Sequence, residues 1–368
     1  MAMPLGFKIS AAVILLLTLL VNIRKPSDLA VGAWIPAEIV SFLWWATGVT
    51  KLDSLDADAI VAVQQRVAAL TPRGAAVHVD AVTHMTVPSG DGYDIPAVLY
   101  HPNSTARALN EQLMVTVYLH GGGWVLGSAA SVDAVARALA VQTNGLVLSV
   151  DYRMAPRHPF PTPVDDGVAV VRWALKHAAS VGGDPRRVAV AGDSAGGNLG
   201  AAVALSLAGP RLLVEAGAWR SPLCAAVLVS PPLSHAYAAR NAGSHARYAH
   251  RYLLLRRVMV AMWSVYLAGP RPDPERVAVT GRDWRASPLE APAWRLRALP
   301  PTLLPYAAAE ILADEIEDFA AAAAATGARG VALRRYERTV HGFFTSGAPE
   351  ARECVTFAAG FLRDHCAR

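Results

Sequence analysis

Charged residues are scarce in this sequence of 368 residues, and neither internal repeats nor low-complexity linkers are evident in it. Only 17% of the residues are charged and 53% are hydrophobic, so the chain is less polar than an average globular protein. This composition excludes an intrinsically disordered chain and indicates apolar surface or a membrane segment. The length is enough for a large core, in one α/β domain with an insertion or in two domains.

Cysteine is also rare. Cys224, Cys354 and Cys366 include no C-x-x-C pair and have no histidine at ligand spacing, so neither a zinc site nor a disulfide framework is indicated. Cys354 and Cys366 could form a bridge only if the fold brought them together, and three unpaired thiols are the favoured interpretation. We expect no metal ion and no cofactor.

A dense basic run is missing, although the net charge is +5. The basic residues are mostly arginines spread through residues 211–300. Such a spread does not favour nucleic-acid binding. An anionic membrane surface would attract the same charge and fits the apolar composition better. We therefore expect no nucleic-acid partner.

One apolar run, Ile9 to Val21, lies near the start of the chain between Lys8 and the pair Arg24 and Lys25. It reaches the roughly 20 residues that span a bilayer only when its neighbours are counted. No A-x-A-like cleavage site follows it. A retained membrane anchor over residues 1–27 is therefore favoured over a cleaved signal, and a buried helix is the third interpretation. An anchor predicts a location in the endoplasmic reticulum or another endomembrane, while basic residues on both sides leave its orientation open.

From about residue 75, short β-like stretches alternate with longer helix-like stretches. The alternation predicts an α/β fold with a mostly parallel sheet and helices on both faces. Residues 76–87 and 94–102 predict an opening antiparallel hairpin. Residues 234–300 lack β-like runs, and we expect them to form a helical cap over the carboxyl ends of the strands, where open α/β sheets bind ligands. Amphipathic helices packed on the side of the domain are the alternative.

A candidate nucleophile, Ser194, lies in the sequence GDSAG at residues 192–196, between a β-like and a helix-like stretch. Small flanking residues permit the sharp, strained turn that exposes the serine of a G-x-S-x-G motif. The N-terminus of the following helix would direct unpaired N–H groups and its positive dipole end at a group beside Ser194. The pentapeptide alone is equally typical of an ordinary turn.

A second motif, HGGGW at residues 120–124, follows another β-like stretch. Consecutive glycines let a backbone approach a ligand closely and offer its N–H donors. Acyl transfer needs such donors because the carbonyl oxygen gains negative charge as its carbon becomes tetrahedral. Gly122, Gly123 and Ala195 are therefore the candidate oxyanion hole, and a flexible loop is the alternative interpretation.

A serine nucleophile needs a base, and His341 is the best placed of the eleven histidines because it follows the last β-like stretch. His120, beside the glycines, is assigned a structural role. The segment after the preceding strand offers Glu310, Asp314 and Glu315 as the acid that orients the base. Glu310 is preferred over Asp314 because it is nearest to the strand end and because carboxylates are favoured in a first helical turn without any catalytic role. The resulting order, serine then acid then histidine, is that of an α/β-hydrolase.

Four ordered motifs together resemble the hormone-sensitive-lipase-type (GDXG) branch of α/β-hydrolase-fold serine esterases, over roughly residues 75–368. They are HGGGW at 120–124, DYRMAPRHPFP at 151–161, GDSAGGN at 192–198 and HGF at 341–343. The resemblance implies an eight-stranded sheet with a helical cap. Its expected parts are a core at 73–233 and 301–368, a cap at 234–300, and an N-terminal part of the cap at 28–72.

The same resemblance implies Ser194 as nucleophile, His341 as base, and Gly122, Gly123 and Ala195 as oxyanion hole. The family usually has an aspartate in a D-x-L-x-D-E pattern, and here the sequence EILADE places Glu310 at that position. The acid therefore departs from the usual residue. Arg153 and Asp151 of the second motif are expected to buttress loops rather than to take part in chemistry.

These features predict a serine hydrolase (esterase, lipase or deacetylase) that cleaves carboxylic esters of hydrophobic molecules through an acyl-enzyme. One alternative is an amidase such as kynurenine formamidase, which bears a similar glycine motif. The other is a non-catalytic receptor, since the gibberellin receptors resemble this family but lack the catalytic histidine. An anchor before the catalytic domain is similar to the organisation of fungal steryl acetyl hydrolases.

Overall fold

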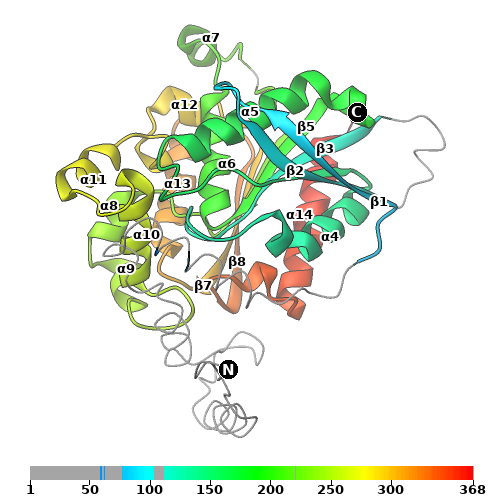
Figure 1. Cartoon of the computed structure of the whole chain (residues 1–368). Coiled ribbons are helices and arrows are strands. Elements are labelled where there is room, and N and C mark those ends of the chain that lie inside the picture. Colours follow the sequence, from blue (N-terminus) through cyan, green and yellow to red (C-terminus); the bar gives the residue numbers. More distant parts are fainter. Residues whose placement is uncertain (1–58, 60–61, 63–76, 103–111, 220, 368) are drawn as a thin grey trace, which may run out of the picture.

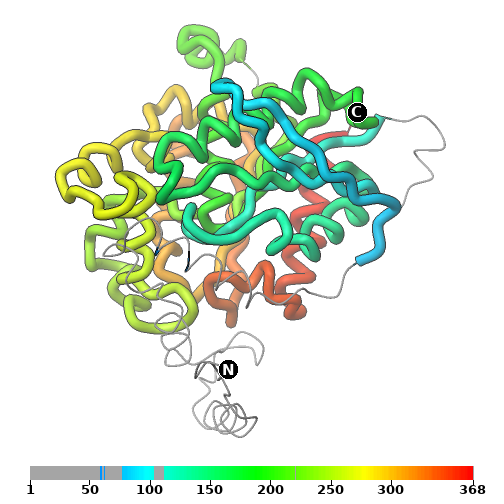
Figure 2. Tube along the Cα trace, in the orientation of Figure 1, coloured from blue at the N-terminus to red at the C-terminus, as the bar shows by residue number. Residues whose placement is uncertain are grey.

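The computed structural model describes residues 77–102, 112–219 and 221–367, together with Ala59 and Ala62. The described chain forms an eight-stranded sheet in the order β1-β2-β4-β3-β5-β6-β7-β8 (Figure 1, Figure 2). The strands are β1 (Ala81–Pro88), β2 (Asp94–His101), β3 (Leu113–Leu119), β4 (Leu146–Val150), β5 (Gly183–Asp193), β6 (Ala225–Val229), β7 (Thr302–Ala309) and β8 (Val331–Val340).

The pairing of the strands confirms the predicted sheet. β1 and β2 form the expected antiparallel hairpin, with Ala81 opposite His101 and Pro88 opposite Asp94. β2 also runs antiparallel to β4, whereas every pair from β4 to β8 is parallel. The carboxyl ends of β3 and of β5 to β8 therefore meet at one edge of the sheet, where all the candidate catalytic residues follow their strands.

Helices cover both faces of the sheet, as predicted. Along β3, Val115, Val117 and Leu119 point to one face and Met114 and Tyr118 to the other, because side chains alternate along a strand. The first face packs against α5 (Thr162–His177), α6 (Ala195–Ser206) and α13 (Ala313–Ala325), and the second against α4 (Asp133–Thr143) and α14 (Pro349–His365). The shorter elements are α7 (Arg211–Glu215) and the 3-10 helices η4 (Ala129–Val132), η5 (Ala178–Val181) and η7 (Phe343–Thr345).

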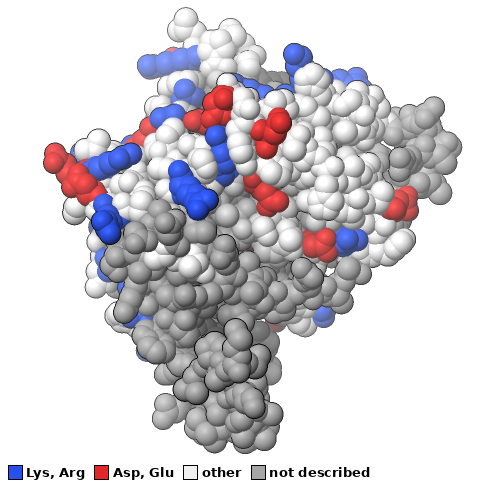
Figure 3. All heavy atoms as spheres, in the orientation of Figure 1, with Lys and Arg blue, Asp and Glu red and all other residues white. Residues whose placement is uncertain are grey.

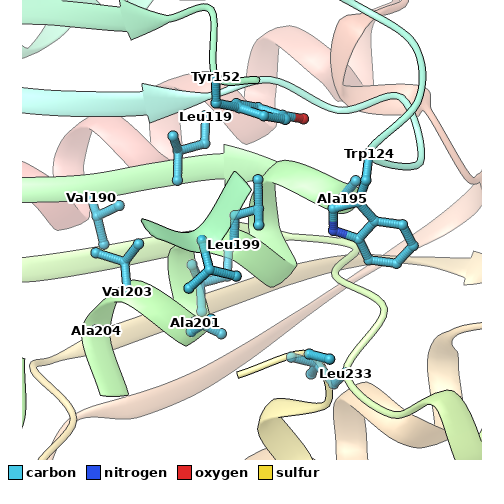
Figure 4. Packing of buried hydrophobic residues seen from close by; sticks show 14 of the residues in the cluster. Leu119, Trp124, Tyr152, Val190, Ala195, Leu199, Ala201, Val203, Ala204 and Leu233 are labelled. Carbon is cyan, nitrogen blue, oxygen red and sulfur yellow. The ribbon is translucent and has the colours of Figure 1, made fainter. Parts of the chain in front are cut away.

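The helix α6 lies in the middle of the apolar core. Every residue from Ala195 to Leu205 is buried, as expected of a helix that is apolar on all sides. Figure 4 shows Leu199 and Val203 of α6 among the side chains of Leu119 and Val190 from the strands. This packing fixes the N-terminus of α6 at the carboxyl edge of the sheet.

Residues 234–300 contain helices and no strand. They form α8 (His235–Ala239), α9 (Gly243–Arg247), α10 (Arg256–Ala268), α11 (Pro274–Thr280), η6 (Pro288–Glu290) and α12 (Ala293–Arg297). The expected helical insertion is therefore present, and Figure 1 shows α8 to α11 gathered at one side of the molecule. The division of the chain into core and cap stays a prediction.

Two predictions concern residues that the structure does not describe. The anchor or signal at 1–27 lies wholly outside the described residues, as does the N-terminal cap part at 28–72 apart from Ala59 and Ala62. None of the helices in the described ranges combines the length and apolar character that a membrane crossing requires.

The prediction of three unpaired cysteines was wrong. A disulfide joins Cys224 to Cys366, with their Cα atoms 5.1 Å apart, and Cys354 is a buried free thiol. Cys224 directly precedes β6, and Cys366 follows α14, which packs against that strand. The two partners are 142 residues apart, so only the tertiary fold brings them together.

Replacement of Cys366 by serine is expected to lower the free energy of unfolding by about 2–5 kcal/mol, because the bridge restricts a long loop of the unfolded chain. A lower Tm in calorimetry checks this. Wild-type protein treated with dithiothreitol is the matched control and should unfold at the same lowered temperature. An unchanged Tm in both samples would show that the bridge does not stabilise the fold.

Candidate active site

Ser194 occupies a strained turn between the end of β5 and the start of α6. Its φ of 52° and ψ of −122° lie in a region that residues other than glycine rarely adopt. The Ser194 N–H donates to the Val229 carbonyl at 2.8 Å, which ties the turn to β6. A Cβ atom on Gly196 would stand 1.9 Å from the Leu119 carbonyl oxygen, so only glycine permits this close approach of α6 to β3. The predicted G-x-S-x-G turn is present.

The structure brings Ser194, His341 and Glu310 into one hydrogen-bonded chain. His341 Nε2 lies 3.0 Å from Ser194 Oγ, and His341 Nδ1 lies 2.6 Å from Glu310 Oε2. Glu310 directly follows β7 and His341 directly follows β8, so two neighbouring parallel strands set the distance between them. Glu310 is 2% exposed and His341 8% exposed, whereas Ser194 is partly exposed at the edge of the sheet.

The carboxylate of Glu310 is held by two further donors. Its Oε1 accepts hydrogen bonds from the Ser230 hydroxyl at 2.8 Å and from the Ala307 N–H at 2.9 Å. Ser230 directly follows β6 and is buried. Because both carboxylate oxygens are bonded, the longer side chain of glutamate is fixed in one orientation toward the imidazole.

Ser230 is not among the site residues that the motifs predict. Ser230 directly follows β6, the strand beside β7, and the ends of neighbouring parallel strands meet at one edge of the sheet. A buried serine without motif context nevertheless looks like ordinary turn material, and only the structure shows its contact with Glu310.

Replacement of Ser230 by alanine is expected to lower kcat for an ester about tenfold with little change in KM, because Glu310 loses a donor to its charged form. Steady-state kinetics with p-nitrophenyl acetate measures both constants. The matched control is Ser206→Ala, which removes a hydroxyl that bonds only the Ala202 carbonyl in α6. Equal kcat values for the two variants would contradict a positioning role of Ser230.

The other two candidate acids lie at the start of α13 and hold the insertion. Asp314 Oδ2 accepts from the Ser244 N–H at 2.8 Å. The buried Glu315 pairs with His245 at 3.2 Å, and burial raises the pKa of the Glu315 carboxyl. These contacts bind α9 to α13. Of the three acids, only Glu310 has a hydrogen bond to His341.

Asp193, inside the GDSAG sequence, connects the nucleophile turn to the glycine loop. Its Oδ1 accepts from the Tyr118 hydroxyl at 2.7 Å and from the Gly121 N–H at 3.2 Å. Burial raises the pKa of this carboxyl. The motifs predict no role for Asp193. A carboxylate among small and apolar residues was nevertheless a signal, because a buried acid needs dedicated partners.

The glycine loop has a backbone that requires glycine at its centre. Gly122 and Gly123 have φ values of 123° and 64°. Within the described chain, the N–H groups of Gly122, Gly123 and Ala195 donate to no backbone carbonyl in the loops and turns. Ala195 is the first residue of α6, where an N–H has no acceptor within the helix. Gly122, Gly123 and Ala195 therefore stay the candidate oxyanion donors.

His120 and the second motif have structural contacts, as predicted. The His120 ring stacks on Tyr152 at 4.3 Å, its Nδ1 lies 2.8 Å from the Gly121 carbonyl oxygen, and burial lowers its pKa. Asp151 accepts from the Ala129 N–H at 2.6 Å, and Arg153 forms ion pairs with Asp91 and Asp166. These bonds hold loops in place around the site.

The insertion packs directly on the glycine loop. Trp124 stacks on Tyr266 of α10 with ring centroids 4.4 Å apart, and it also contacts Trp263 at 4.4 Å. A Cβ atom on Gly123 would lie 2.1 Å from the Met262 sulfur. One face of α10 therefore borders the candidate oxyanion hole.

Asn198, the last residue of the GDSAGGN motif, joins the same parts of the structure. Its side-chain oxygen accepts from the Trp124 indole N–H at 3.1 Å, and its amide nitrogen donates to the carbonyls of Pro232 and Ala286 at 2.8 Å each.

In the described ranges, no group of three or more histidine, cysteine or acidic side chains could hold a metal ion.

Comparison with known proteins identifies the family. A sequence profile of the alpha/beta hydrolase fold matches residues 116–345. Carboxylesterase NlhH of Mycobacterium tuberculosis is 49% identical over 125 residues, which cover 33% of this chain and 38% of NlhH. Carboxylic ester hydrolase LipN of the same organism is 36% identical over 271 residues, which cover 73% of this chain and 66% of LipN.

A solved structure supports the same assignment. The crystal structure of a thermostable esterase from Pseudomonas putida superposes with a TM-score of 0.75 at 26% identity and covers 94% of this chain and all of that one. The match spans only 38% of the length of NlhH. The assignment to a family therefore rests on the profile match and on the similarity of the fold. The chain belongs to the α/β-hydrolase fold family, in the hormone-sensitive-lipase-type branch that its four motifs indicated.

Proposed function

We propose that this chain hydrolyses carboxylic esters through an acyl-enzyme on Ser194. The observation that carries the proposal is the hydrogen-bonded chain from Ser194 through His341 to Glu310, which begins at a strained turn at the N-terminus of α6. The relatives NlhH and LipN are a carboxylesterase and a carboxylic ester hydrolase, and they support the same reaction class.

In the first half of the reaction, His341 Nε2 accepts the hydroxyl proton of Ser194 while Oγ forms a bond to the ester carbonyl carbon. The carbonyl π electrons move to oxygen, and the Glu310 carboxylate stabilises the imidazolium through Nδ1–H. The bond from carbon to the alcohol oxygen then breaks, and the alcohol leaves with the proton of His341 Nε2.

In the second half, water takes the place of the alcohol. His341 removes a proton from the water as its oxygen attacks the acyl carbon, and the proton returns to Ser194 Oγ when the acid leaves. The N–H groups of Gly122, Gly123 and Ala195 are the proposed donors to the oxyanion in both halves. Their positions next to the nucleophile turn, held through Asp193, support this role.

The contact between Gly123 and Met262 supports a short acyl group. The Met262 side chain, which is 3% exposed, fills the space on the α10 side of the glycine loop. A long acyl chain would need this side chain to move. Hydrophobic esters with short acyl groups are therefore the proposed substrates.

The two alternatives make different predictions. A non-catalytic receptor needs neither base nor orienting acid, and the complete chain of hydrogen bonds at Ser194 disfavours it. Amide hydrolysis uses the same residues and is distinguished from ester hydrolysis by the substrate. N-formylkynurenine is therefore included beside the esters in the assay.

Labelling with a fluorophosphonate probe and turnover of p-nitrophenyl esters together test the proposed function. The expected result is one covalent adduct on the peptide that contains Ser194, loss of ester turnover in step with labelling, and turnover that falls from acetate to long acyl chains. Tight ligand binding without turnover would favour the receptor. Turnover of N-formylkynurenine above that of every ester would favour the amidase.

Membrane attachment through residues 1–27 also stays a prediction, because this segment lies outside the described residues. Carbonate extraction of membranes from expressing cells checks it. An anchored chain stays in the membrane pellet, and release into the supernatant contradicts an anchor.

A further inference from the structure

A long part of the chain before and within the insertion has no acidic residue. No aspartate or glutamate occurs between Glu215 and Asp273, whereas this stretch contains seven arginines. The ester-hydrolase mechanism uses none of these arginines. Among the described ones, Arg271 and four others are exposed, and we call these four others the basic surface: Arg240, Arg247, Arg251 and Arg257.

The local fold gathers these arginines in one region. The Arg256 N–H donates to the Ala249 carbonyl at 3.0 Å, and the Arg256 guanidinium donates to the Ala239 carbonyl at 3.0 Å. These bonds place residues 239–240, 249–251 and 256–257 side by side. In Figure 3, the coloured side chains visible along the left edge below α11 are blue, where Figure 1 places α9 and α10.

The basic surface is not neutralised by the described part of the protein. None of its four arginines forms an ion pair with a described acidic side chain. By contrast, Arg153, Arg186, Arg285 and Arg334 elsewhere in the fold each pair with an acid. Among the described residues, no acid therefore neutralises these four positive charges.

The basic surface borders the catalytic residues. Tyr248 and Tyr252, which alternate with its arginines in the sequence, pack against Ala309 and Val340, the residues directly before Glu310 and His341. Next to them, the Leu253 side chain lies 2.8 Å from the position of a Cβ atom on Gly342. A partner bound to the arginines would therefore lie close to the strand ends that carry Glu310 and His341.

We propose that the basic surface docks the protein on a bilayer that contains anionic lipids. Clusters of four or more basic residues bind such bilayers, and tyrosines are enriched at the boundary between headgroups and acyl chains. The two tyrosine rings pack against the strand ends and are half-buried, so part of each tyrosine stays exposed at this surface. Docking itself does not depend on the proposed function. Its consequence, that an ester dissolved in the bilayer reaches Ser194, rests on that function.

Flotation of the full-length protein with vesicles tests the proposal. One set of vesicles contains phosphatidylcholine alone, and the other contains phosphatidylcholine with phosphatidylglycerol. The expected result is stronger binding to the anionic set. This preference should disappear at high salt, because the Debye length falls from about 10 Å at 0.1 M to about 3 Å at 1 M. Binding that is equal for the two sets would overturn the proposal, since a hydrophobic anchor alone gives that result.

A pair of charge-matched variants locates the binding. The first replaces Arg240, Arg247, Arg251 and Arg257 with glutamine. The second makes the same change at four exposed basic residues on other parts of the surface: Arg172, Lys176, Arg329 and Arg352. We expect the first variant to lose at least about tenfold in partitioning to anionic vesicles, and the second to bind like the wild type.

Two results would contradict the proposal, and two controls separate it from the catalytic one. An equal loss in both variants would assign the binding to net charge, and binding to a DNA duplex in preference to anionic vesicles would assign the surface to nucleic acid. Turnover of p-nitrophenyl acetate, which is water-soluble, should be unchanged in the first variant and reports its folding. Flotation of the Ser194→Ala protein should match the wild type, so docking is measured even where ester hydrolysis fails.

Discussion

Replacement of Ser194 by alanine is expected to lower kcat for p-nitrophenyl acetate by about 10⁴-fold or more, because no other group at the site can form the acyl-enzyme. His341 and Glu310 lose their function with it, since they act only on the serine hydroxyl. Alanine accepts the φ of 52° at this turn at about the same cost as serine, so the fold should persist. Steady-state kinetics and fluorophosphonate labelling measure the two losses.

The control for this variant is its thermal stability. An unchanged Tm with lost turnover and lost labelling assigns the chemistry to Ser194. Equal turnover by wild type and variant would refute the assignment, and turnover that survives without labelling would require a nucleophile other than this serine.

The sequence predicted the fold to the level of strand order along the chain, because short β-like runs and amphipathic helices alternate so regularly. The hairpin of β1 and β2 and the strand-free insertion at 234–300 follow from the same patterns. The disulfide between Cys224 and Cys366 did not, since its partners are 142 residues apart and are joined only by the packing of α14 beside β6. A pairing that depends on tertiary contact has no local signal.

The site was predictable where its residues lie in motifs. Ser194 and Gly196 lie in a motif of small residues. The close approach of α6 to Leu119 shows why a larger residue would not fit at Gly196. Ser230 has no such context. Its hydroxyl reaches Glu310 because β6 and β7 end side by side, and spatial adjacency of that kind is specified by sheet order rather than by local sequence.

The acidic segment after β7 contains one acid that contacts His341 and two that contact the insertion, and the sequence alone does not distinguish them. Glu310 contacts the histidine, whereas Asp314 bonds Ser244 and Glu315 pairs with His245. Three residues within six positions thus connect the orienting acid to the helices of the insertion.

Isosteric amide substitutions separate these two roles. Glu310→Gln is expected to lower kcat by about 10⁴-fold, as removal of the orienting charge does in other triads, because the imidazole loses its correct tautomer and the charge that stabilises its cation. Asp314→Asn should change kcat less than about tenfold, since an amide oxygen can still accept from the Ser244 N–H. Kinetics with p-nitrophenyl acetate over a range of pH measures both variants. Comparable losses in the two would mean that the acid is shared, and a large loss at Asp314 alone would transfer the role of orienting acid from Glu310 to the first turn of α13.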